Sequence, residues 1–89
     1  MNKSLDVRVY GRVQGVFFRL AAKEKALELG LAGLVQNEAD GSVSLEVEGE
    51  ETALTKFIEW CRHGSEYAWV KRLDVSEGET RGLHDFIIR

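Results

Sequence analysis

Apolar and polar residues alternate in some parts of the chain and recur at helical spacing in others, which predicts the order β-α-β-β-α-β. Alternation near the start predicts a half-buried strand over about residues 5–13. A glycine-bearing segment, residues 11–15, then interrupts the pattern. Apolar positions at helical spacing follow over about residues 18–29, and Gly30 is a natural stop. The first third of the chain is therefore predicted to form a strand, a loop and a helix.

The middle of the chain predicts a hairpin and a second helix. Two strands are expected over about residues 33–39 and 42–48, joined by Asp40-Gly41, because both turn residues tolerate the positive φ of a tight hairpin. The second helix ends at Gly64, and its apolar face consists of Leu54, Phe57, Ile58 and Cys61. The apolar pattern then changes parity, so we expect a strand with a bulge near Lys71-Arg72. A short last strand, about residues 85–88, is expected at an edge.

This order of elements predicts an α+β protein with the ferredoxin-like, or split βαβ, architecture, in which both helices pack on one face of an antiparallel sheet. The other face is expected to be largely exposed. Because β-α-β crossovers are right-handed, the first two strands run parallel. This topology brings the loop at residues 11–19 and the end of the second strand to the same edge of the sheet, where we look for function.

The composition is that of an ordinary globular protein. The 89 residues include 12 Lys and Arg against 15 Asp and Glu, a net charge of −3, so one domain over residues 1–89 is expected. The chain has no basic block, and we therefore expect no nucleic-acid partner, since such binding depends on neutralising phosphates. No apolar run approaches the roughly 20 residues that span a bilayer. We expect a cytoplasmic protein that binds no membrane and, without a long exposed apolar stripe, a monomer.

The cysteine and the histidines give little sign of redox or metal chemistry. Cys61 is the single cysteine and falls on the apolar face of the second helix, which favours a buried small hydrophobe. It has no metal-ligand spacing with His63 or His84, and we assign neither histidine a catalytic role. Trp60 and Trp69 are interpreted as packing aromatics, although an exposed Trp69 could border a ligand. We therefore expect no metal and no other cofactor.

The segment from Gln14 to Arg19 is the first candidate for chemistry. It leaves a strand and enters a helix, where main-chain amides can converge on an anion at the positive end of the helix dipole. Gly15 permits a tight approach of the backbone, and Arg19 falls in the first helical turn, where its fork of donors could grip two phosphate oxygens. Taken alone, the segment is equally compatible with a tight packed turn that leaves Arg19 on the surface.

Asn37 is the second candidate. It lies late in the second strand and shares the in-facing parity of Val35, and a polar amide there needs a partner. An isolated strand asparagine commonly caps a hairpin or bonds to a nearby loop. The topology, however, also places Asn37 beside residues 14–19. An uncharged donor and acceptor would then stand next to the anion loop.

Two blocks of the sequence together resemble the acylphosphatase family. Residues 9–19 match the family's phosphate loop, G-x-V-Q-G-V-x-F-R, and residues 29–43 match its G-x-V-x-N and D-G-x-V segments, in order and at family spacing. The similarity covers nearly the whole chain and extends to Phe57, Trp60, Gly64, Ala68 and Val70. The chain departs from the family's common pattern at Leu34 and at Gly64-Ser65, which we expect to change packing and loop rigidity and not chemistry.

The resemblance implies hydrolysis of the carboxyl-phosphate anhydride of acyl phosphates, with an acyl phosphate as the small-molecule partner and inorganic phosphate as product or inhibitor. It implies that Arg19 binds the phosphate and stabilises the transition state, and that Asn37 positions the attacking water. The phosphate loop it implies consists of Gln14, Gly15, Val16, Phe17, Phe18 and Arg19. A carboxylate is a weak base that leaves without a general acid, in agreement with a site that has no carboxylate pair, catalytic histidine or metal.

Two functions of other classes stay open at this stage. An RNA-recognition module has a similar fold and a glycine-aromatic core, but its aromatics alternate on a central strand, whereas Phe17 and Phe18 fall at a strand-to-helix loop of an acidic protein. A non-catalytic module that binds acyl or carbamoyl phosphate would also use Arg19 and Asn37. Turnover distinguishes the enzyme from this module.

Overall fold

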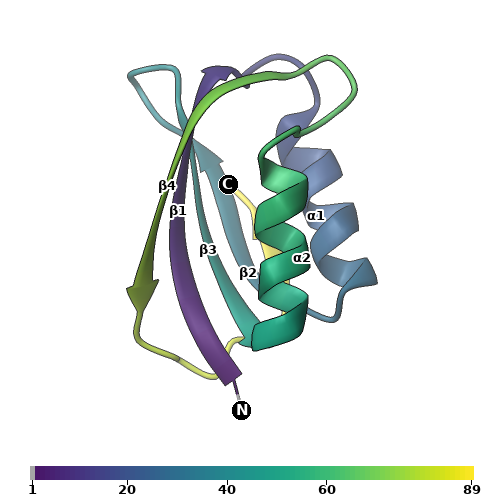
Figure 1. Ribbon diagram of the computed structural model, residues 1–89, viewed down its shortest axis with the longest axis vertical. Helices are drawn as coiled ribbons and strands as arrows, with labels where there is room; N and C mark the ends of the chain where they lie inside the picture. Colours follow the sequence, from purple (N-terminus) through teal and green to yellow (C-terminus); the bar gives the residue numbers. More distant parts are fainter. Residues whose placement is uncertain (1) are drawn as a thin grey trace.

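The computed structural model describes residues 2–89 and has two layers, a five-stranded sheet and two helices that cover one of its faces (Figure 1). No helix within residues 2–89 is both long enough and apolar enough to cross a bilayer. The predicted ferredoxin-like α+β architecture is confirmed. In chain order the elements are β1 (Asn2–Arg12), α1 (Phe18–Glu28), β2 (Ala32–Asn37), β3 (Val43–Glu50), α2 (Glu51–Cys61), β4 (Trp69–Gly78) and β5 (Phe86–Ile88).

The order of the strands across the sheet is β4-β1-β3-β2-β5. The four longer strands are antiparallel to their neighbours, as predicted, whereas the short β5 pairs parallel with β2, which makes the sheet mixed. Because β1 and β2 are both antiparallel to the β3 strand between them, they run parallel to each other. The loop that follows β1 and the last residue of β2 therefore lie at the same end of the sheet.

The core lies between the sheet and the helices, and it fixes the start of α1. Phe18 opens that helix, is 1% exposed, and places its ring 5.4 Å from the ring of Trp60 on α2. Burial of such a side chain contributes about 1.5–3 kcal/mol and anchors the end of the preceding loop. Trp60 is thus a packing aromatic, as predicted, whereas the same prediction for Trp69 is wrong, because that side chain is 62% exposed.

The hairpin between β2 and β3 is longer than predicted: both strands stop short of their expected ends at the turn, and the N–H of Glu38 donates to the carbonyl of Ser42 at 2.8 Å, which leaves residues 39–41 as the loop. The strand pairs end at Asn37 and Val43, the N–H of Gly41 donates to the carbonyl of Glu38 at 3.1 Å, and Gly41 has a φ of 92°. A turn of this kind followed by a left-handed glycine is the usual three-residue hairpin connection. Asp40 accepts hydrogen bonds from the hydroxyl and N–H of Ser42, and these bonds lower the pKa of its carboxyl.

The predicted bulge in β4 is confirmed. Tyr10 pairs with Arg72 and Gly11 pairs with Val70, so Lys71 has no opposite residue on β1. Beyond this point the register returns to one residue for one over the rest of the strand pair. The extra residue accounts for the change of parity between the two apolar runs of the strand.

A buried carboxylate holds the connection between β4 and β5. Glu48 of β3 is 5% exposed and accepts hydrogen bonds from the N–H groups of Leu83, Arg81 and Gly82 at 2.6, 2.5 and 3.3 Å. These bonds lower the pKa of the Glu48 carboxyl. The periodicity of the sequence did not identify this residue as an anchor, since Glu48 simply continues a strand. Its contacts decide where β5 begins.

Candidate active site

The loop between β1 and α1 has the backbone of an anion cradle. The φ angles of Gly15 and Phe17 are 72° and 62°, whereas Val16 and Phe18 have no positive φ. Alternation of this kind turns successive N–H groups to one concave side. Within residues 2–89, none of the amides of residues 15–19 donates to a protein acceptor. The loop thus offers several free donors at the N-terminus of a helix, where the helix dipole favours an anion.

Phe17 is the single non-glycine residue with positive φ among residues 2–89, and it stands at the cap position of α1. A left-handed conformation costs an ordinary side chain about 1–2 kcal/mol. Strain of this kind persists where the surrounding structure enforces it, commonly at functional sites. Here the buried Phe18 on one side and the glycine turn on the other enforce it.

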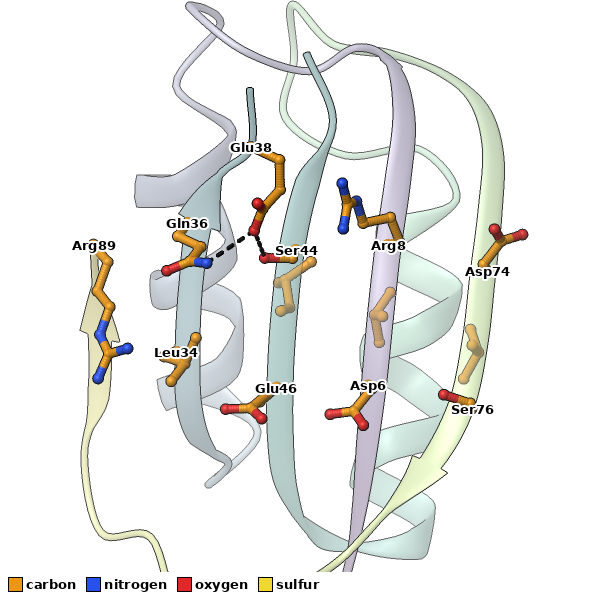
Figure 2. Close-up of a pocket in the computed structure, with 13 residues that line it drawn as sticks. Asp6, Arg8, Leu34, Gln36, Glu38, Ser44, Glu46, Asp74, Ser76 and Arg89 are labelled. Carbon is orange, nitrogen blue, oxygen red and sulfur yellow. Dashed lines mark hydrogen bonds between the residues drawn. The ribbon is translucent and has the colours of Figure 1, made fainter. Parts of the chain in front are cut away.

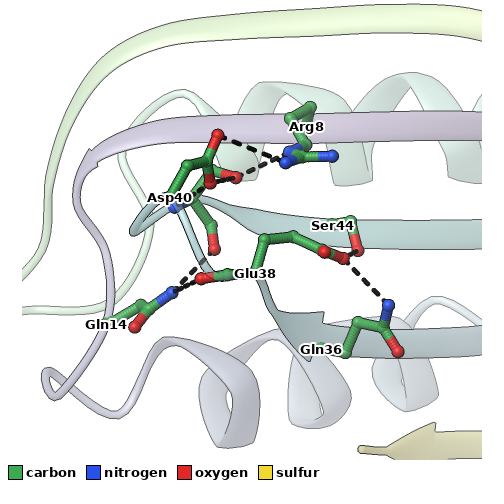
Figure 3. Close-up of polar contacts among 7 residues, drawn as sticks. Arg8, Gln14, Gln36, Glu38, Asp40 and Ser44 are labelled. Carbon is green, nitrogen blue, oxygen red and sulfur yellow. Dashed lines mark hydrogen bonds and ion pairs between the residues drawn. The ribbon is translucent and has the colours of Figure 1, made fainter.

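Gln14 ties the loop to the β2–β3 hairpin (Figure 3). Its side-chain amide donates to the carbonyl of Glu38 at 2.8 Å and to the carbonyl of Ser42 at 2.9 Å. Both side-chain donors are therefore engaged by the protein, which leaves the main chain of Gln14 for any contact with an anion. On the other side of the loop the hydroxyl of Ser65 donates to the carbonyl of Val16 at 2.7 Å. The departure at Ser65 from the common family pattern thus touches the loop directly.

Arg19 lies in the first turn of α1, half-buried, and its guanidinium donates to the main-chain oxygen of Arg89 at 2.7 Å. The N–H of Arg89 in turn donates to the carbonyl of Val35 at 2.8 Å, so the sheet holds the acceptor in place. One arm of the guanidinium fork is engaged in this way and the other donors stay available. Sequence reasoning missed Arg89, and no local signal could have found it, because it is 70 residues away from Arg19.

Asn37 ends β2 and is exposed. Val35, two residues earlier on the same side of β2, is completely buried under the helices. Asn37 faces the same side but lies beyond the helices, so its side chain is exposed. Within residues 2–89 the Asn37 side chain takes part in none of the hydrogen bonds that cap the hairpin or hold the loop. Its amide is therefore available to a ligand.

One depression of about 390 Å³ brings these groups together. Arg19 and Asn37 line it with Gly15, Phe17 and Phe18, and its apolar walls include Leu20 and Ile88. Of the residues expected in the phosphate loop, Gln14 and Val16 do not line it. The depression combines free amides, a guanidinium and an uncharged amide side chain. Such a set of groups suits an anion with three oxygens and a water beside it.

A larger depression of about 460 Å³ lies on the open face of the sheet (Figure 2). Three of its polar groups are paired with one another: Glu38 accepts from Gln36 at 2.8 Å and from Ser44 at 2.5 Å, and the Ser44 bond is the main cause of a lowered pKa at Glu38. Arg8 beside them is bonded to Ser42 and Asp40 (Figure 3). Carboxylates outnumber the cationic groups among its lining residues, so this face repels an anion.

Cys61 is completely buried, as predicted, and burial raises the pKa of its thiol to about 12. The thiol belongs to the core and does not line the depression that holds Arg19. Trp69, though exposed, does not line that depression either.

The fold and the site define a ferredoxin-like sandwich whose β1–α1 loop, with its free amides, lies where two parallel strands end. The chain belongs to the acylphosphatase family, since a family model described as Acylphosphatase matches residues 5–88. It is 46% identical to a protein of a Nocardioides strain named Acylphosphatase, over 100% of this chain and 90% of the relative. An acylphosphatase of Methylococcus capsulatus is 46% identical over 90% of this chain and 87% of its own length. The crystal structure of acylphosphatase from Bacillus subtilis has a TM-score of 0.95 and 39% identity, covering 100% of this chain and 99% of that one.

Proposed function

We propose that the protein hydrolyses acyl phosphates to a carboxylate and inorganic phosphate, with Arg19 and the loop amides holding the phosphoryl group and Asn37 positioning the water. Membership of the acylphosphatase family and the fold shared with solved acylphosphatases support the reaction. The observation that supports the residues is their meeting in one depression, with free amides at residues 15–19 and an unengaged amide on Asn37. All of these groups come from one chain, so the reaction needs no second copy.

The phosphoryl oxygens bind to the main-chain amides at the start of α1 and to the free arm of the Arg19 guanidinium. As charge develops on the transferred group, fixed donors stabilise it without reorganising, which is the largest contribution to catalysis of this kind. The bond from Arg19 to the main-chain oxygen of Arg89 holds the guanidinium in one orientation before substrate arrives. The amide of Asn37 orients a water in line with the phosphorus.

The chemistry balances without a protein acid or base. The water oxygen forms a bond to phosphorus while the bond from phosphorus to the acyl oxygen breaks, and that electron pair leaves on the carboxylate. One water proton passes to a phosphoryl oxygen, which gives dihydrogen phosphate. Because a carboxylate is a weak base, its departure needs neither protonation nor a Lewis acid, and we propose a metal-independent reaction.

The test is steady-state hydrolysis of benzoyl phosphate in the presence of a chelator, with inorganic phosphate as a competing ligand. Arg19→Lys should lower kcat/KM by about a hundredfold or more and weaken phosphate inhibition, because Lys lacks the planar fork. Asn37→Ala should lower kcat by about a hundredfold and keep phosphate inhibition. Arg62→Lys, at an exposed arginine after α2, is the matched control and should behave like the parent.

Three results would overturn parts of this proposal. Full activity of Arg19→Lys would show that the Arg19 guanidinium does not bind the phosphoryl group. Weaker phosphate inhibition with unchanged kcat in Asn37→Ala would show that the two roles are exchanged. A folded parent that binds phosphate and turns over no acyl phosphate would be the non-catalytic binding module.

A further inference from the structure

Exposed apolar side chains gather along one side of the molecule, next to the depression that holds Arg19. Phe17 is 71% exposed, and Leu20 and Leu27 of α1 are each more than half exposed. Ile87 and Ile88 of β5, the strand that pairs with β2, are also exposed. Leu20 and Leu27 are seven residues apart, which places them on the same face of α1 about two turns from each other. Side chains alternate along a strand, and Ile87 pairs with Leu34, which lines the depression on the open face, so Ile87 points to that face. We call the other four residues the apolar strip, namely Phe17, Leu20, Leu27 and Ile88.

The strip begins at the depression that holds Arg19 and joins it to a second depression through Ile88. Phe17, Leu20 and Ile88 line that depression together with Arg19 and Asn37. Ile88 also lines a second depression, of about 570 Å³, whose wall includes Leu27 and Ile87. A group bound at Arg19 could therefore extend past Ile88 and reach Leu27 while staying in contact with apolar side chains.

The length of the strip sets the size of its occupant. From Leu20 to Leu27 the helix rises about 10 Å, at 1.5 Å per residue. Carbon–carbon bonds of about 1.5 Å in an extended zigzag each advance about 1.25 Å, so this is the span of about eight such bonds. His84 and Asp85, just before β5, line the second depression, so polar groups border its far end. Lys23 also lines this depression and lies between Leu20 and Leu27, about one helical turn from each. A short or polar acyl group would leave most of the strip in water.

We propose that the apolar strip binds the acyl chain of the substrate, and that the preferred substrates are acyl phosphates with an unbranched aliphatic chain of about six to eight carbons. The inference rests on the proposed function, because the phosphoryl group at Arg19 sets the start of the chain. Phe17 and Leu20 contact the carbons nearest the anhydride, Ile88 contacts the middle, and Leu27 contacts the end. Acetyl and carbamoyl phosphate should be poorer substrates, because their small acyl groups have little apolar surface to bury against the strip.

The experiment compares hydrolysis of acetyl, butyryl, hexanoyl and octanoyl phosphate by the full chain. Complete burial of a methylene raises affinity by about fourfold. A chain in an open groove is buried on one side, so each methylene should contribute about half of that free energy, which is about twofold in affinity. Six added methylenes then raise kcat/KM by about 60-fold from acetyl to octanoyl phosphate. The gain should fall on KM and leave kcat nearly constant, because the chain binds equally in the ground and transition states.

Variants of Leu27 locate the end of the chain. Leu27→Gln should remove the increase between butyryl and octanoyl phosphate, which lowers the ratio of their kcat/KM values by up to about 16-fold for four methylenes, whereas Leu27→Met should preserve the ratio. Val75→Thr is the control, because Val75 is an exposed apolar residue on β4, at the opposite edge of the sheet. It should leave the whole series as in the parent. The inhibition constant of inorganic phosphate should be the same in every variant.

Several outcomes would overturn this inference while the proposed function stands. A parent whose kcat/KM is flat across the series does not bind the chain on the strip. Equal losses for acetyl and octanoyl phosphate in Leu27→Gln would indicate a structural role. A parent that sediments as a dimer while Leu27→Gln sediments as a monomer would make the strip an interface between copies. If the parent hydrolyses none of the four substrates, the proposed function itself fails.

Discussion

Replacing Gln14 with alanine should test whether the Gln14 side chain holds the β1–α1 loop in the conformation that binds an anion. The side-chain amide of Gln14 makes two hydrogen bonds, at 2.8 and 2.9 Å, to carbonyls on the far side of the site. At about 1 kcal/mol for each bond, the loss is about 2 kcal/mol. Each carbonyl, however, keeps another partner: the carbonyl of Glu38 still accepts from Gly41, and that of Ser42 still accepts from Glu38. No buried acceptor is left bare, so the cost should stay near 1–2 kcal/mol.

This free energy corresponds to a fall in Tm of roughly 4–16 °C, at 4–8 °C per kcal/mol for a domain of this size. Thermal unfolding followed by circular dichroism measures it directly. The same variant should bind phosphate more weakly, because a loop released from the hairpin must be ordered again when the anion binds. Inhibition of benzoyl phosphate hydrolysis by inorganic phosphate measures that second effect.

Gln36→Ala is the matched control. Gln36 is a glutamine of β2 whose side-chain amide makes one hydrogen bond, to the carboxylate of Glu38, and it lies on the open face of the sheet and not at the loop. It should lower Tm by less than Gln14→Ala and leave phosphate inhibition unchanged. If both variants have the same Tm and the same phosphate inhibition, Gln14 does not hold the loop and our reasoning about the cradle is wrong.

Three further predictions test other parts of the structure. Gly33→Ala should lower stability by about 2–3 kcal/mol in urea titration, because φ is 154° and a Cβ would meet the carbonyl oxygen of Glu46 on β3; near-parent stability would mean that the two strands can separate. Glu48→Gln should be less stable than the parent at pH 7 and should lose less stability on acidification. The pKa of Glu48 is lowered in the folded protein, chiefly by the Leu83 N–H. The stability that Glu48 contributes is therefore fully present above about pH 4.5, its ordinary pKa, and is lost as the pH falls through the lower pKa of the folded state. Parallel urea titrations from pH 7 to pH 3 measure it, and equal slopes for both proteins would contradict it. Cys61 should resist alkylation at pH 8 in the folded protein and react on unfolding, because burial raises its pKa to about 12; rapid labelling of the native chain would show that the core opens at α2.

The sequence alone determined which residues face inward and where the chain changes direction. Alternation and helical spacing identified β1, both helices and the bulge at Lys71, because burial on one face imposes a period that can be counted along the chain. The loop from Gln14 to Arg19 and the position of Asn37 followed from local signals and from one rule of handedness. These are properties of short segments, and a single sequence contains them.

The tertiary structure decided how those segments act together. It directs the side chain of Gln14 into the hairpin, buries Glu48 under the segment before β5, and turns β5 parallel to β2. It also places the main-chain oxygen of Arg89 against the guanidinium of Arg19, across 70 residues of chain. Contacts of this kind depend on main-chain atoms that every residue has, so no residue type marks them in advance. Their positions follow from the packing of the whole sheet against both helices.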